Sequence, residues 1–128
     1  MLFPPKIRNW LFIAFAILTL ISAGYHFLDI FYPFDKSPVW RHILFIGINL
    51  FCTYGVLKRP KYFVYFFAVL LVQQYYSHGS FLVNLWIEKG QIHWISVIDL
   101  LLMPIGLICL VDDYRMKRSQ AGPTQKNL

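Results

Sequence analysis

Residues 10–31 read WLFIAFAILTLISAGYHFLDIF, and this stretch decides the class of the protein. It is apolar almost throughout and lacks the period-two alternation of a strand in a membrane barrel. About 20 residues of α-helix cross a hydrocarbon core about 30 Å thick. Because a lipid-facing backbone must form its hydrogen bonds within its own segment, the stretch predicts a membrane-spanning helix.

Three further apolar runs of similar length follow the first. We therefore predict an all-α polytopic membrane protein, an antiparallel four-transmembrane-helix bundle, with helices at about 10–31, 39–57, 62–86 and 92–111. Residues 1–113 would form the transmembrane domain, and residues 114–128 a polar cytoplasmic tail. Pro104 lies inside the fourth run, where it should kink the helix or be tolerated through contacts with neighbouring helices.

The composition supports the same class. Charged residues make up 14% of the 128 residues, against about 25% in soluble domains. The net charge of +6 would also suit a nucleic-acid partner. We exclude that partner because the basic residues flank apolar runs and form no stripe with base-reading polar residues. The expected partners are the lipid bilayer and, beyond it, other membrane subunits.

The basic residues predict the orientation of the chain. Nine of the twelve fall on one side of the four predicted spans: Lys6, Arg8, Lys58, Arg59, Lys61, Arg115, Lys117, Arg118 and Lys126. The other three, Lys36, Arg41 and Lys89, fall on the opposite side. Since positive charge concentrates in cytoplasmic loops, we expect a multi-pass membrane protein with both termini in the cytoplasm.

All four histidines lie near the opposite, outer ends of the runs. Polar groups inside a membrane are costly and normally face the bundle or a wet cavity, so each helix should turn its polar seam inward. The seams predict one outward-facing pocket. Its candidate ligand-binding residues are His26, Asp29, Arg41, His42, Asn49, Gln74, Ser77, His78, His93 and Asp99.

Three interpretations of this pocket stay open. Imidazole suits Zn, Cu and Fe, so His26, His42, His78 and His93 are candidate ligands of a metal, or two of them of a haem. Histidines and carboxylates also relay protons or bind a polar head group without any metal. Finally, short polar side chains hold membrane helices together, and the seams would then be purely structural.

The histidines also suggest an internal repeat. His26 precedes His42 and His78 precedes His93 by similar spacings, and each pair brackets a short turn with an acidic and a basic residue. This spacing is consistent with a parallel duplication of one helical hairpin. Any four-span chain with short loops would show comparable spacing.

Residues 23–27, AGYHF, the proline-containing loop after them and residues 55–60, GVLKRP, resemble the DoxX-like group of small four-helix bacterial membrane proteins. The resemblance covers about the first sixty residues. The acidic residue usual in the second helix of that group is not evident, and Asn49 stands in its region. The resemblance implies a four-helix fold in a bacterial inner membrane and, as for some members, a link to membrane redox systems that work with quinone or sulfur compounds.

The leading functional prediction is a small integral membrane protein with an outward-facing His/Asp pocket, serving as a redox-associated or ligand-binding membrane subunit. One alternative is an accessory or assembly protein whose polar seams are structural. Another is a membrane enzyme that acts on a lipid or a quinone. The sequence names no substrate and does not decide whether the protein is an enzyme.

Overall fold

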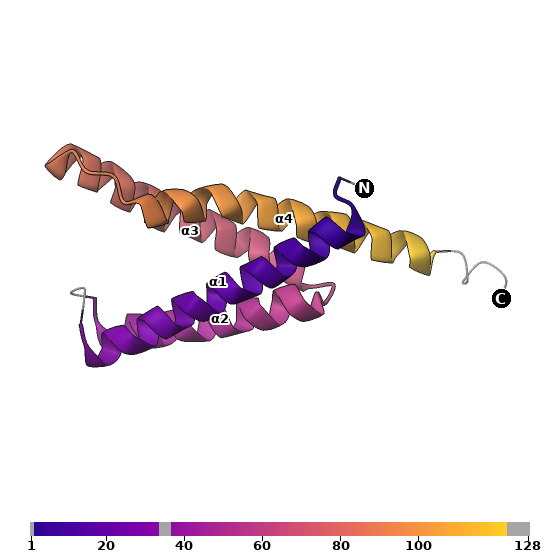
Figure 1. Ribbon diagram of the computed structural model, residues 1–128, viewed down its shortest axis with the longest axis horizontal. Helices are drawn as coiled ribbons and strands as arrows, with labels where there is room; N and C mark the ends of the chain where they lie inside the picture. The colour runs from indigo at the N-terminus through magenta and orange to yellow at the C-terminus, as the bar shows by residue number, and fades with distance from the viewer. Residues whose placement is uncertain (1, 34–36, 123–128) are drawn as a thin grey trace. The chain divides into compact units, whose positions relative to one another are not determined.

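The structure is a computed structural model that describes residues 2–33 and 37–122. Its regular elements in these ranges are four α-helices: α1 (Pro5–Phe31), α2 (Val39–Lys58), α3 (Phe63–Lys89) and α4 (Trp94–Ala121). The predicted all-α fold with four helices is confirmed. The chain divides into two compact units, one containing α1 and α2 and the other containing α3 and α4. In each unit the two helices pack side by side as a hairpin (Figure 1).

Residues at the ends of α1 and α2 explain how this hairpin forms. α1 begins at Pro5, earlier than the predicted residue 10, because proline at the first helical position has no amide to leave unsatisfied. α2 ends at Lys58, and Arg59 adopts a left-handed conformation with φ of 51°. The Arg59 guanidinium lies 4.9 Å from the centre of the Phe12 ring and donates to Asn9 Oδ1 at 3.2 Å. These contacts tie the end of α2 to the first turns of α1.

The α3–α4 hairpin has a glycine at one side of its turn and a histidine at the other. α3 ends at Lys89, and Gly90 (φ 61°) closes it with a hydrogen bond from its amide to Trp86 O. A left-handed glycine is a common helix terminator because it carries no Cβ. α4 begins after His93, whose side chain accepts a hydrogen bond from the amide of Ser96.

The predicted end of the fourth helix is wrong. The sequence predicts a helix that stops near residue 111 and a polar tail from residue 114, whereas α4 continues to Ala121. Asp113 and Lys117 form an ion pair of 2.8 Å at i,i+4, the spacing that places opposite charges on one helix face. The polar residues after Val111 therefore extend the helix. Residues 123–128 of the predicted tail lie outside the described residues.

Large apolar side chains are exposed along all four helices, including Trp10, Ile21, Val69, Ile87 and Leu101. Soluble proteins rarely expose such extensive apolar surface. By length and composition α1, α2 and α4 are apolar enough to cross a membrane. α3 has the same length as α1 but is not among them, since its middle carries glutamines, tyrosines, serines and a histidine. Three of the four predicted spans are thus long and apolar enough to cross a membrane.

Candidate functional site

Three polar side chains meet at the loop-bearing end of the α1–α2 hairpin. His26 and Asp29, three residues apart, share one face near the end of α1, and His42 lies in the first turns of α2. His42 Nε2 is 3.0 Å from Asp29 Oδ2, and His42 Nδ1 is 3.1 Å from His26 Nδ1. His42 is therefore the central member of a chain that runs from Asp29 through His42 to His26.

The three side chains of this cluster differ in burial, so only one end of the series of contacts is accessible. Asp29 is 2% exposed and His42 is 3% exposed, whereas His26 is only half-buried. The contact between the two Nδ1 atoms needs one proton, which one ring donates and the other accepts. A carboxylate beside the other nitrogen of a histidine fixes its tautomer and stabilises its imidazolium form. The arrangement can therefore hold or pass a proton, and His26 is its accessible end.

Aromatic rings shape the surroundings of His26. The Phe45 ring, one turn after His42 on α2, is stacked on the His26 ring with centroids 5.0 Å apart. The Tyr25 ring meets His26 edge-on at 5.5 Å. Phe45 is absent from the predicted site, because sequence spacing shows which residues share a face of one helix but not which residue of the neighbouring helix lies opposite.

The deeper polar residues of this hairpin bind one another locally. Thr19 Oγ1 and Thr53 Oγ1 are 2.7 Å apart and join α1 to α2. The Asn49 side chain donates to the carbonyl of Phe45 at 2.8 Å, four residues back in its own helix. The predicted seams of α1 and α2 thus do face each other, but Asn49 does not contact the histidines through this bond.

A second cluster forms in the α3–α4 hairpin around Ser96. The Ser96 Oγ lies 2.9 Å from His78 Nδ1 and 2.9 Å from His93 Nδ1. His78 Nε2 is 3.8 Å from Asp99 Oδ2, within ion-pair range but longer than a hydrogen bond. Ser96 is 1% exposed, while the Asp99 side chain is 51% exposed. Ser96 lies in the polar seam of the fourth run but is not among the predicted site residues.

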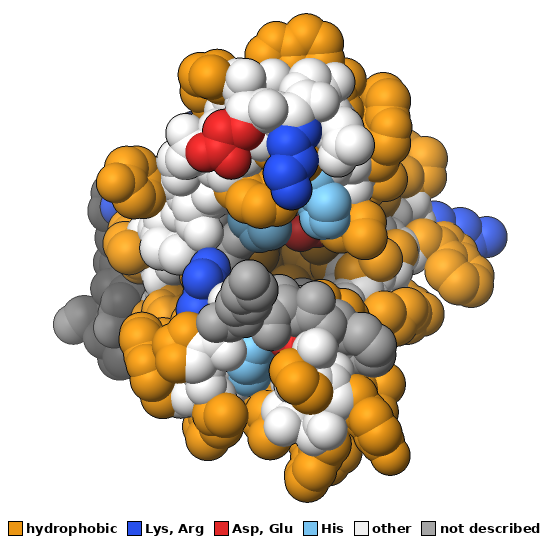
Figure 2. Space-filling model, turned by 90° about the vertical axis from the view of Figure 1, so that its left-hand side faces the viewer, with side chains coloured by type: hydrophobic (Ala, Val, Ile, Leu, Met, Phe, Trp, Pro, Cys, Tyr) orange, Lys and Arg blue, Asp and Glu red, His pale blue; other side chains and the backbone are white. Residues whose placement is uncertain are grey.

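Besides Asn49, three predicted site residues lie apart from these clusters. Arg41 is exposed, donates to Ser37 Oγ at 3.3 Å and lies 5.6 Å from the centre of the Phe45 ring. Gln74 and Ser77 are half-buried on α3, and no side-chain hydrogen bond joins either to the His78 cluster within the described ranges. Figure 2 shows histidine and acidic side chains reaching the surface among hydrophobic ones.

The contacts do not follow the predicted duplication. A duplication pairs His26 with His78 and His42 with His93. In the structure the central histidine, which faces both a carboxylate and a further polar group, is His42 on the second helix of one hairpin and His78 on the first helix of the other. Each hairpin places a carboxylate near one imidazole and a second imidazole beyond it, which is contacted directly in the first hairpin and through Ser96 in the second.

In residues 2–33 and 37–122, no group of three or more His, Cys, Asp or Glu side chains is placed to hold a metal ion. The reason is visible in the α1–α2 cluster, where both ring nitrogens of His42 point at neighbouring side chains. Metal ligation by the four histidines stays a prediction of the sequence. It would require the His42 ring to turn away from its present neighbours.

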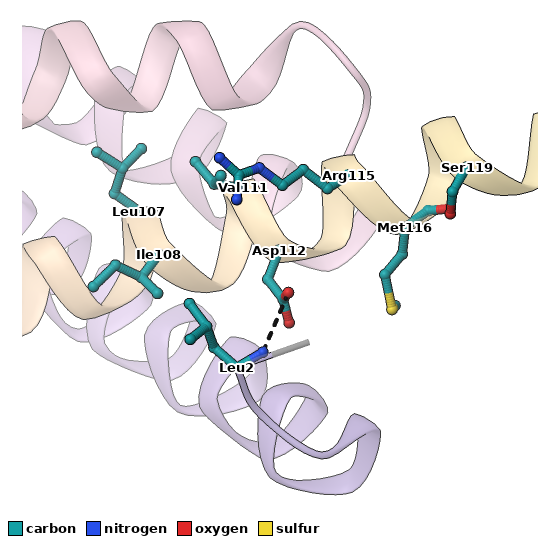
Figure 3. Close-up of a pocket in the computed structure, with 8 residues that line it drawn as sticks. All are labelled: Leu2, Leu107, Ile108, Val111, Asp112, Arg115, Met116 and Ser119. Atoms are coloured by element: carbon teal, nitrogen blue, oxygen red, sulfur yellow. Dashed lines mark hydrogen bonds between the residues drawn. The ribbon is translucent and has the colours of Figure 1, made fainter.

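A hollow of about 650 Å³ lies along the C-terminal half of α4, bordered by Leu2 (Figure 3). Its wall on α4 is mainly apolar, with Leu107, Ile108 and Val111, and Asp112 accepts a hydrogen bond of 3.4 Å from the amide of Leu2. No histidine lines it. The hollow is thus distinct from the imidazole clusters, which lie at the other end of α4 and in the other hairpin.

Comparison of the chain with protein-family models, with curated proteins and with solved structures finds no match.

Proposed function

We propose that this protein is a multi-pass membrane protein that binds a membrane-soluble ligand at His26 and donates a hydrogen bond to it, with the proton held by His42 and Asp29. The observation that carries the proposal is the continuous contact from the buried Asp29 to the half-buried His26, with successive distances of 3.0 Å and 3.1 Å. A carboxylate within a membrane-spanning segment is expensive and normally marks a functional site.

Four spans, not three, fit the charges best. With four spans the basic residues divide nine to three between the two sides. If α3 did not cross, the basic residues after α4 would move to the outer side and Lys89 to the inner side, leaving six on each. Two polar side chains of α3 also have partners on α4, since His78 contacts Ser96 and the Tyr75 hydroxyl donates to Leu100 O. A hairpin that satisfies its own polar groups can enter lipid as a unit.

This topology places both termini in the cytoplasm and the imidazole clusters at the outer ends of the spans. A bacterial inner membrane is the setting that the resemblance to DoxX-like proteins implies. The ligand we propose is a quinone-type molecule, because its ring stacks on aromatic side chains and its carbonyl oxygen accepts a hydrogen bond from imidazole. Phe45, stacked on His26, and Tyr25 supply the aromatic surroundings.

An accessory protein with structural polar seams is the second candidate. The bond between Thr19 and Thr53 favours it, since this pair holds α1 against α2 deep in the hairpin without any titratable group. The two candidates differ in what they require of His26. A structural seam needs only its packing, whereas a ligand site needs its ring to respond to an added molecule.

The test is ¹⁵N NMR of histidine-labelled protein in lipid nanodiscs titrated with ubiquinone-1 and with menadione. We expect one of these quinones to shift the ring signals of His26, assigned by their loss in His26→Gln. Asp29→Asn should weaken the binding about tenfold or more, because it removes the negative charge beside His42 Nε2 that stabilises the protonated form of His42. Asp99→Asn is the matched control and should leave the affinity unchanged. Ring signals that neither quinone moves, or an affinity indifferent to Asp29→Asn, would contradict the proposal and favour the accessory role.

A further inference from the structure

The hydrogen bonds around Ser96 fix where the protons lie. The Ser96 amide donates to His93 Nδ1, so this nitrogen carries a lone pair and the proton of the neutral ring is on Nε2. The Ser96 hydroxyl, 2.9 Å from the same nitrogen, donates to it as well. A hydroxyl has only one proton to give, so at the contact with His78 Nδ1 the serine oxygen accepts and the histidine donates.

We propose that His93, Ser96 and His78 form a proton wire that loads and unloads Asp99. His93 is half-buried and caps α4 at the exposed loop of residues 90–92, where water can reach it. Asp99 lies six residues further along α4, about 9 Å deeper at 1.5 Å per residue. The wire therefore joins the hairpin loop to a carboxylate within the proposed span. It concerns the α3–α4 hairpin and needs no ligand at His26.

Each transfer along the wire breaks one bond to hydrogen and forms another. A proton on the Asp99 carboxyl passes to His78 Nε2, which lies 3.8 Å away, so this transfer requires the carboxyl group to rotate to within hydrogen-bond distance. The proton of His78 Nδ1 passes to Ser96 Oγ, and the Ser96 hydroxyl proton passes to His93 Nδ1. His93 then releases its Nε2 proton to water. The net change is one proton from Asp99 to water, and loading retraces the same atoms.

The same three groups, Ser96, His78 and Asp99, are also the residue types of a nucleophilic triad. The surroundings of Ser96 oppose that role. Its side chain is 1% exposed, so a carbonyl substrate has no approach to Oγ, and its hydroxyl proton points at a second imidazole. A relay needs only neighbours at hydrogen-bond distance, and the serine has one on each side.

The test follows protonation of Asp99 by time-resolved infrared spectroscopy after a pH jump, with protein in nanodiscs. The carboxyl band of Asp99 is identified by its loss in Asp99→Asn. We expect Ser96→Ala to slow protonation of Asp99 at least tenfold, and Ser96→Thr, which keeps a hydroxyl, to restore most of the rate. Equal rates in the wild type and Ser96→Ala would overturn the wire.

His93→Asn separates the wire from a merely structural role of His93. Asparagine is a good N-cap and can accept the hydrogen bond from the Ser96 amide, but it cannot carry a proton. The wire predicts that His93→Asn slows protonation of Asp99 as much as Ser96→Ala does, with unchanged helix content by circular dichroism. A wild-type protonation rate in His93→Asn would show that His93 acts only as the cap of α4 and would also overturn the proposal.

Discussion

The hydroxyl of Tyr75 on α3 donates a hydrogen bond of 2.7 Å to the carbonyl oxygen of Leu100 on α4. In a regular helix this carbonyl would accept from the amide of residue 104, but residue 104 is proline and has no amide hydrogen. α4 runs through Pro104 without interruption. The neighbouring helix thus supplies the donor that the proline removes, and the predicted tolerance of Pro104 through a neighbouring helix is confirmed.

Tyr75→Phe should lower the free energy of unfolding by about 1 kcal/mol, because it removes one hydrogen bond and leaves the Leu100 carbonyl without a donor. The measurement is equilibrium unfolding in mixed micelles. In a Pro104→Ala background the loss should be smaller, since an alanine at this position provides the missing amide. Equal losses in the two backgrounds would show that the tyrosine does not compensate for the proline.

The sequence predicted the helices well because each long apolar run has one physical solution in lipid. The sequence also places His26 and His42, and likewise His78 and His93, on either side of one short turn, and in the structure each pair lies in one cluster. It could not predict Ser96 as the bridge in the second pair or Phe45 as the ring stacked on His26. These contacts depend on how far one helix is rotated against its neighbour, which no pattern within a single helix records.

The prediction for the end of α4 fails for a related reason. It equates the change from apolar to charged residues at Asp112 with the end of the helix, although charged residues form helices readily once they leave the lipid. The ion pair between Asp113 and Lys117 supports the extra turns. The hydropathy pattern predicts where lipid ends, which is not the same as where a helix ends.

Asp29→Ala and Asp99→Ala form a matched pair of substitutions with different expected costs. Asp29 is buried with its carboxylate 3.0 Å from His42 Nε2, so its removal leaves a buried imidazole without its charged neighbour and should cost about 1–3 kcal/mol of unfolding free energy. The Asp99 carboxylate is half exposed and 3.8 Å from His78, beyond hydrogen-bond distance, so its removal should cost less than that of Asp29. Equilibrium unfolding in mixed micelles measures both losses of unfolding free energy. Similar losses for the two substitutions would contradict the burial of Asp29.

His93→Ala should destabilise the protein by about 1 kcal/mol, because the Ser96 amide loses the side chain that caps the first turn of α4. His93→Asn should restore that loss. Hydrogen exchange of the amides in the first turn of α4 provides the measurement. Exchange in His93→Ala as slow as in the wild type would mean that the cap contributes nothing.

The native cysteines should react slowly with maleimide in the folded protein. Cys52 and Cys109 are free thiols, and both are buried. Neither should be labelled within minutes in nanodiscs, and both should be labelled after unfolding in dodecyl sulfate, as mass spectrometry will show. Rapid labelling of either thiol in the folded state would contradict its burial and would require its replacement before engineered cysteines are used.

The central claim, that both imidazole clusters open on the outer side of a four-span protein, is tested most directly by labelling engineered cysteines in intact cells. Ser37→Cys lies in the loop before α2 and Gln91→Cys in the loop before α4, so each reports on the end of one hairpin. Both should react with a membrane-impermeant maleimide added from outside. If either position reacts only after the membrane is permeabilised, the proposed topology is contradicted. If position 37 reacts from outside and position 91 only after permeabilisation, α3 does not cross the membrane.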